Sequence, residues 1–167
     1  MLETTEDISD LQTLLDASLA RSGPHLTSII HPETRTPTAA AVVRALTGMK
    51  VLVVATVDDA GRPRTSAVDG HFLRGRWVFT TSGDAVKVRD LRARPAISAS
   101  HVDEERFALF THGEAEFLTP SHPDWHWVED HLTAHYDASP TTWGPDIAYV
   151  RIQPRWSVAY AVDVDAI

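Results

Sequence analysis

The residues best suited to bind an anion stand where one predicted strand meets a helix. Thr80, Thr81 and Ser82 end the strand, and Lys87 lies in the helix that follows. The first N–H groups of a helix have no partner within it, and the helix dipole favours an anion there. Hydroxyl groups can bind phosphate oxygens, and a lysine adds a positive charge. The pattern predicts a site for a phosphorylated small molecule.

Four histidines form a second group with ligand chemistry: His122, His126, His131 and His135. Their spacing places two pairs, four residues apart, on faces of one helix, and such pairs can bind zinc or haem. The HExxH motif is absent. An amphipathic helix with a polar histidine face explains the pattern without a ligand, so we predict no metal site. Haem binding stays as an alternative.

These side chains need a scaffold of short strands. Eight segments have the composition and the flanking turn residues of strands. They are residues 50–57, 64–68, 71–73, 77–81, 96–101, 106–111, 114–118 and 147–164. Residues 51–57 are apolar on both faces, which predicts a barrel wall covered on both sides. Many short antiparallel strands with a few peripheral helices predict a mainly β fold, a closed barrel.

The remaining chain predicts helices and special backbone positions. Helical periodicity or composition marks residues 8–20, 38–47, 84–94 and 121–136. Gly113 predicts a bulge or a barrel corner, and Pro154 predicts a break in the last strand. Residues 24–37 hold three prolines and are predicted as a covering loop. We therefore divide the chain into an N-terminal helix and covering loop, residues 1–37, and a barrel domain, residues 38–167.

Composition excludes several classes of function. The chain has 167 residues, 43% of them hydrophobic, and no cysteine, so disulfides and thiolate chemistry are absent. Its net charge of −8 argues against a nucleic-acid partner and against an anionic membrane surface. There is no apolar run long enough to span a membrane, and the acidic N-terminus lacks the pattern of a secretory signal. We expect a cytoplasmic protein.

Three pieces of the sequence carry a family resemblance. They are VATVDDAGRPRTSAV, WVFTTSGDAVKVRDLRARPAISAS and FTHGEAEFL, and they lie within residues 45–118. Together they resemble the FMN-binding split-barrel family typified by pyridoxamine 5'-phosphate oxidase. The resemblance implies a split β-barrel, a six-stranded antiparallel Greek-key barrel with peripheral helices. It also implies a homodimer with the cofactor at the subunit interface.

The resemblance assigns roles to individual residues. Lys87 matches the lysine that binds the flavin phosphate, and Arg64 matches an arginine at the phosphate or ribityl chain. The other residues implied to line the cofactor are Thr65, Ser66, Thr80, Thr81 and Ser82. Trp156 lies where a C-terminal strand approaches the partner's cofactor, although packing in the core explains it equally well. No catalytic residue can be assigned.

Four departures from the family pattern bear on the substrate. Val86 stands where the oxidase has an arginine, Asp69 replaces a lysine that helps to bind the substrate phosphate, and Ala108 replaces a glutamine near the ring. A carboxylate at position 69 would repel a phosphate. The C-terminal arginine-and-histidine signature is also missing. We therefore predict that pyridoxamine phosphate is not the substrate.

The resulting hypothesis is a flavin-binding oxidoreductase that transfers a hydride between FMN and a small organic molecule. The chemistry would belong to the cofactor, and the protein would bind and orient it. An F420-dependent reductase is the first alternative, because the acidic tail of that deazaflavin needs a basic groove. Such a groove could use Arg62, Arg64, Lys87, Arg89, Arg92 and Arg94. A non-catalytic protein that binds flavin or haem is the second alternative.

Overall fold

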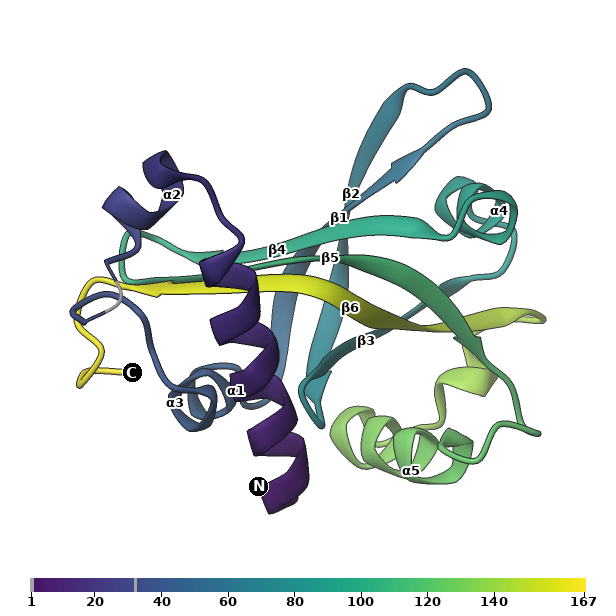
Figure 1. Cartoon of the computed structure of the whole chain (residues 1–167). Coiled ribbons are helices and arrows are strands. Elements are labelled where there is room, and N and C mark those ends of the chain that lie inside the picture. Colours follow the sequence, from purple (N-terminus) through teal and green to yellow (C-terminus); the bar gives the residue numbers. More distant parts are fainter. Residues whose placement is uncertain (1, 32) are drawn as a thin grey trace.

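The computed structural model describes residues 2–31 and 33–167, and its centre is a closed antiparallel barrel of six strands (Figure 1). The strand order around the barrel is β1-β2-β3-β6-β5-β4. The strands are β1 Met49–Val57, β2 Pro63–Leu73, β3 Arg76–Ser82, β4 Ala96–Asp103, β5 Phe107–Leu118 and β6 Ile147–Ala161. The predicted six-stranded antiparallel barrel is confirmed.

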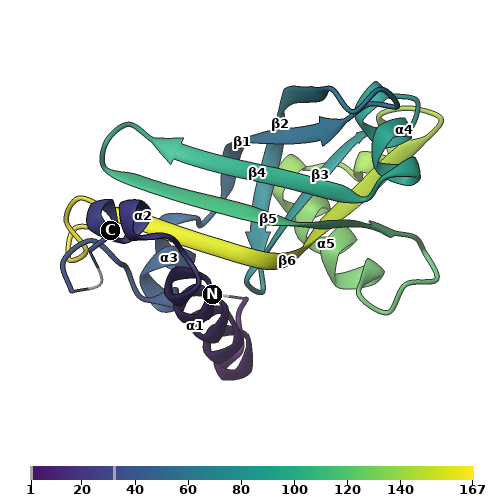
Figure 2. The same cartoon turned by 45° about the horizontal axis from the view of Figure 1, so that its top comes forward.

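Helices surround the barrel at its ends and sides (Figures 1 and 2). They are α1 Thr5–Ala20, α2 Pro24–Ile29, α3 Ala39–Ala45, α4 Val86–Ala93 and α5 Trp125–Tyr136, with a short 3₁₀ turn, η1, at Pro140–Thr142. The segment predicted as a covering loop thus contains α2, because Pro24 occupies the first helical turn, where its fixed φ suits a helix. Among the described residues, no helix is long and apolar enough to cross a membrane.

Strand β1 shows how the core is built. Leu52 and Val54 point into the barrel and are fully buried, whereas Val51 and Val53 are 58% and 41% exposed. The prediction that both faces of this strand are covered is therefore wrong for the single chain. The helices pack elsewhere: α1 lies against β6, and α5 packs on β3 and on the other end of β6 (Figures 1 and 2). The apolar outer face of β1 is left open.

Strand β2 runs unbroken where the sequence predicted two shorter strands. Gly70 lies at the predicted gap and faces the barrel interior, where a Cβ atom would come within 2.7 Å of the Leu52 Cβ. The glycine thus lets the strand pass close to β1 rather than ending it. One continuous strand carries both the predicted cofactor residues and a histidine, His71, beneath α5.

The predicted irregularity at Gly113 is confirmed as a register shift between His112 and Gly113 in the pairing of β5 with β6. A Cβ atom at Gly113 would lie 2.1 Å from the Gln153 carbonyl oxygen, so only glycine fits. Pro154 pairs with Gly113 within an unbroken β6. The predicted break at Pro154 is wrong, because the bulge accommodates a residue that cannot donate a hydrogen bond.

Helix α5 packs over a second, smaller core on the outside of the barrel. Trp125, Val128 and Leu132 point inward and meet Val78 of β3 and Tyr149 of β6. The prediction that one apolar face of this helix packs inward is confirmed. Its polar side carries His126, His131 and His135, whereas His122 precedes the helix.

Candidate functional site

The predicted phosphate site forms a small pocket between β2 and the start of α4. Arg64, Thr65 and Ser66 of β2 line it together with Lys87 of α4, and Thr56 and Val86 complete it. Its volume is about 170 Å³. Residues from two separate segments, all predicted to hold the same ligand, are therefore brought together. A lysine, an arginine and two hydroxyls suit the phosphate end of a flavin.

The turn between β1 and β2 holds Arg64 in place. Asp58 is 3% exposed and accepts hydrogen bonds from the backbone N–H groups of Ala60 and Arg62. Its second oxygen lies 2.9 Å from Arg62 Nε and 3.3 Å from Arg64 Nη2. The backbone hydrogen bond from Arg62, with the side-chain contact of the same residue, lowers the pKa of Asp58 to about 2. A permanent anion thus anchors Arg64 at the mouth of the pocket.

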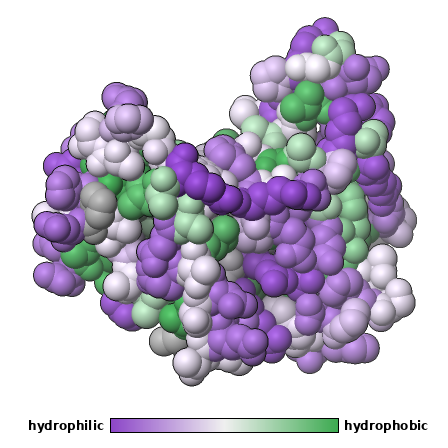
Figure 3. Space-filling model, in the orientation of Figure 1, coloured by the Kyte–Doolittle hydropathy of each residue, from purple (hydrophilic) through white to green (hydrophobic). Residues whose placement is uncertain are grey.

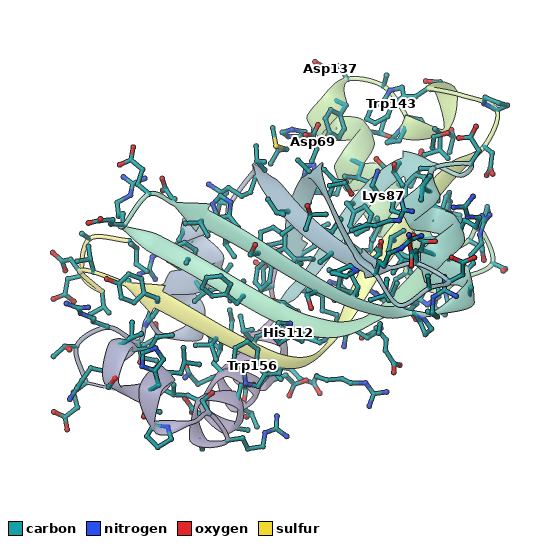
Figure 4. All side chains as sticks on the ribbon, turned by 90° about the horizontal axis from the view of Figure 1, so that it is seen from above. Asp69, Lys87, His112, Asp137, Trp143 and Trp156 are labelled. Carbon is teal, nitrogen blue, oxygen red and sulfur yellow. The ribbon has the colours of Figure 1, made fainter. Side chains whose placement is uncertain are left out.

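Lys87 has its charge available for a ligand. Its Nζ atom lies 3.5 Å from the Thr81 hydroxyl, which is a weak contact. None of the ion pairs between the described residues includes Lys87. Helix α4 begins after Ala85 without a side-chain cap from the described residues, so its first N–H groups remain available. Lys87, which is labelled in Figure 4, and Val86, the first residue of α4, therefore line the same pocket.

The rest of the predicted Thr-Thr-Ser corner lies beside the pocket. Thr80 and Thr81 are half-buried on β3, and Ser82 is exposed and donates to Asp84. Gly83 closes the corner, since a Cβ there would come within 2.0 Å of the Asp146 carboxylate. Of the corner, Thr81 alone contacts Lys87 among the described residues. The roles of Thr80 and Ser82 stay predictions.

Trp156 lies apart from this pocket, on the side of the barrel that α1 covers (Figure 4). Its ring stacks on His112 with centroids 4.7 Å apart, and its Nε1–H donates to the Ser18 carbonyl oxygen at 3.2 Å. In one chain, Trp156 therefore fixes α1 to β6. Its predicted approach to a partner's cofactor needs a second subunit and stays a prediction.

A second hollow adjoins the phosphate pocket and shares Arg64 with it. Its volume is about 470 Å³, and it is lined by Asp58, Asp59, Arg64, Arg89, Asp90, Ala93 and Arg94. This hollow therefore contains three of the six basic residues that were predicted to form a groove for the acidic tail of F420. Three aspartates alternate with them, and the buried Asp90 lies 3.6 Å from Arg94. The hollow is polar and close to neutral rather than strongly basic.

The four histidines divide between two environments, and the prediction that His122 and His126 share a helical face is wrong, because α5 begins at Trp125 and His122 precedes it. His122 lies 3.3 Å from Glu116 in an ion network with Arg151 and Asp124. His131 and His135 meet the buried His71 of β2. Across residues 2–31 and 33–167, no group of three His, Cys, Asp or Glu residues could hold a metal ion. The histidine face is thus partly an interior contact.

Sequence reasoning missed three residues near the site. Asp58, in the turn between β1 and β2, anchors Arg64. His71 and Tyr136 were not singled out. His71 Nε2 lies 3.0 Å from the hydroxyl oxygen of Tyr136, the last residue of α5. The one signal in the sequence was the Asp69–His71 spacing of two, which places both on one face of β2.

The structure is thus a six-stranded split barrel with a small pocket at a strand-to-helix corner. The sequence profile of the pyridoxamine 5'-phosphate oxidase family matches residues 38–159, nearly the whole barrel. The chain belongs to this family. A search of the curated proteins finds no match.

Solved structures share the fold at low sequence identity. The haem storage protein HutZ from Vibrio cholerae is 20% identical with a TM-score of 0.61, over 72% of this chain and 93% of that one. A FAD-binding protein from Mesorhizobium loti is 20% identical with a TM-score of 0.59, over 76% and 95%. An F420 reductase is 22% identical with a TM-score of 0.54, over 68% and 94%. The shared fold therefore accompanies three different cofactors.

Proposed function

We propose that the protein is a flavin-dependent oxidoreductase that binds FMN through the pocket between β2 and α4. The observation that carries this proposal is the meeting of Lys87 with Arg64, Thr65 and Ser66 around one pocket. Lys87 and Arg64 would neutralise the phosphate, and the hydroxyls would accept and donate hydrogen bonds along the chain that follows it. The bound flavin would supply hydride transfer to or from a small organic substrate.

We further propose a homodimer that covers the open face of the barrel. Val51 and Val53 on β1, Val102 on β4 and Phe110 on β5 are exposed apolar residues on adjacent strands. Val53 pairs with Ser100, and Ser100 with Phe110, so these residues form a row across three strands. Exposed apolar patches of this kind mark interaction surfaces. The surface is also hollowed between the projecting β1–β2 hairpin and the end that carries α2 (Figure 3).

The substrate is proposed to lack a phosphate group. Asp69 is exposed on the outer face of β2, on the same strand as the pocket residues Arg64 to Ser66. Its carboxylate would repel a second phosphate near the flavin ring. This favours a neutral or cationic organic molecule. A cytoplasmic location and the lack of nucleic-acid and membrane partners stay predictions from the sequence.

An F420-dependent reductase is the second candidate. The hollow lined by Arg64, Arg89 and Arg94 continues from the phosphate pocket and could accept an acidic extension of the cofactor. The aspartates in the same hollow weaken that interaction, so we place FMN first. A non-catalytic haem or flavin carrier is a further alternative, supported only by the fold that the chain shares with HutZ.

The test is a titration of cofactor-free protein with FMN and, separately, with F420 and haem, followed by fluorescence or absorbance. Saturable binding of FMN that Lys87→Ala weakens and Lys50→Ala leaves unchanged would support the proposal. Lys50 is the matched control, because it is the other lysine of the chain and lies on β1 outside the pocket. Binding of none of the three would refute a cofactor-dependent function.

A further inference from the structure

The hollow beside the phosphate pocket contains a buried carboxylate that lacks a full hydrogen bond. Asp90 of α4 lines this hollow and is 2% exposed. Its Oδ2 atom has no hydrogen-bond partner among the described residues. Its Oδ1 atom lies 3.6 Å from Arg94 Nη2 and 4.0 Å from Arg89 Nε, and both distances are too long for a hydrogen bond. Buried polar groups are nearly always hydrogen-bonded, so we expect Asp90 to accept from a bound molecule.

The hollow and the phosphate pocket adjoin at Arg64, between the β1–β2 hairpin and α4 (Figure 1). Lys87 lines the pocket and Asp90 lines the hollow. The two residues are three apart on α4, so their side chains are neighbours on the helix surface. At the far end of the hollow, Arg94 Nε donates to the Val57 carbonyl oxygen at 3.0 Å and joins α4 to β1. A ligand held by its phosphate at Lys87 thus passes Arg64 to reach Asp90.

The two spaces differ in size. The pocket measures about 170 Å³, and the hollow measures about 470 Å³. Sites that enclose small molecules usually measure about 300–1,000 Å³. The pocket alone therefore suits a phosphate with its neighbouring atoms, whereas the hollow has the size of a site for a further part of the ligand.

The charges of the hollow indicate which chemical groups that further part carries. Arg64, Arg89 and Arg94 supply positive charge for a phosphate, whereas Asp90 repels anions and only accepts hydrogen bonds. A tail of carboxylates would satisfy the arginines and be repelled by Asp90. A phosphate followed by a ribose fits both, because the two vicinal hydroxyls of the sugar can donate to the two oxygens of one carboxylate.

Asp58 does not compete for these donors. It also lines the hollow, but one of its oxygens already accepts from the backbone N–H groups of Ala60 and Arg62, and the other accepts from Arg62 Nε. Within the described part of the chain, no three ligating side chains are placed to hold a metal ion. The unsatisfied acceptor of the hollow is therefore Asp90, and the expected partner is a group that donates hydrogen bonds.

We propose that the flavin of this protein is the dinucleotide FAD, and that Asp90 recognises the ribose of its adenosine half. The proposal rests on the flavin-dependent function above and extends the ligand beyond FMN. The FMN half keeps its phosphate at Lys87, and the second phosphate lies at Arg64 and Arg89. The ribose hydroxyls then donate to Asp90. FMN ends at its own phosphate and would leave this buried carboxylate unpaired.

The test is isothermal titration calorimetry of the cofactor-free protein with FMN and, separately, with FAD. We expect FAD to bind at least about 10-fold more tightly, since a hydrogen bond to a charged group contributes about this factor. Asp90→Asn keeps the size of the side chain and removes its charge. It should abolish the preference for FAD and leave the Kd of FMN unchanged. Asp130→Asn, at an exposed position of α5, is the matched control and should keep the preference.

The outcomes separate this proposal from the proposed function. If neither flavin binds, the flavin-dependent function fails and this proposal fails with it. If FMN binds and FAD binds no more tightly, only the dinucleotide is overturned. A preference for FAD that survives in Asp90→Asn would overturn the role of Asp90.

A second variant keeps the test decisive if Asp90→Asn does not fold. Arg89→Gln changes a side chain that is 72% exposed, so the core is left intact. It should weaken FAD binding by about 3- to 5-fold, the size expected of an exposed charge contact, and leave FMN binding unchanged. An unchanged affinity for FAD in this variant would overturn the placement of the second phosphate in the hollow.

Discussion

Acidification should destabilise the fold through His71. Its folded pKa of about 4 lies below the ordinary value of 6.5, so the unfolded chain binds more protons than the folded one as the pH falls. The stability from the neutral, buried ring is therefore complete above the unfolded pKa and is lost progressively as the pH falls toward the folded value. Linkage with these two values gives a loss of about 1.5–2 kcal/mol between about pH 7 and pH 5.

The assay is urea unfolding at a series of pH values. His71→Gln should flatten the pH dependence, whereas His126→Gln, on the exposed side of α5, should keep it. Asp58, Glu116 and Asp124 have lowered pKa values, and their stabilisation is lost only at lower pH, so this window isolates the histidines. NMR titration of the His71 ring gives the same pKa without mutation. Retention of the full pH dependence in His71→Gln would refute the reasoning.

Three other perturbations follow from contacts described above. Lys87→Ala should weaken FMN binding by about 1.5–3 kcal/mol, or about 10- to 150-fold in Kd, and an unchanged Kd in fluorescence titration would remove Lys87 from the site. Gly113→Ala should lower the free energy of unfolding by about 1–3 kcal/mol because its Cβ would meet the Gln153 backbone, whereas Gly23→Ala, with open space around it, should not; equal effects in urea unfolding would contradict this. Arg151→Met should cost about 2 kcal/mol in the same assay, because it leaves Glu116 and Asp124, both partly exposed, without their shared cation. A stability equal to wild type would show that solvent already screens these charges.

Local signals in the sequence carried most of the fold. Apolar segments, the turn residues between them and the corner at Thr80 to Ser82 mark the positions of the six strands and of α4, although β2 and β5 were each predicted as two shorter strands. Gly113 identified the bulge, because a glycine within a strand pattern signals a close approach of backbone. Such features depend on residues that are neighbours in the sequence, and for that reason the sequence alone predicts them.

The errors came from features that depend on distant residues. Gly70 resembles a strand end in the sequence, but the space it saves is taken by Leu52 of another strand. Pro154 resembles a break, but β6 continues through it with a bulge at Arg155, opposite His112 and Gly113 of β5. The histidines between residues 122 and 135 were interpreted as one polar face, whereas His131 and His135 contact the buried His71 of β2. In each of these three cases, the residues next to it in the sequence do not reveal the distant partner.

The unbroken course of β2 has a consequence for how this chain can vary. Residues of a strand point alternately to opposite sides, so inserting one residue between Ser66 and Ala67 would turn Asp69 and His71 into the barrel and turn the core residue Val68 outward. An insertion of two would restore the facing but shift Tyr136's partners by about 7 Å relative to the pocket. The number of residues in β2 therefore fixes the distance between the pocket beside Lys87 and the residues that contact α5. Length changes should be tolerated in the β1–β2 turn and rejected along the strand itself.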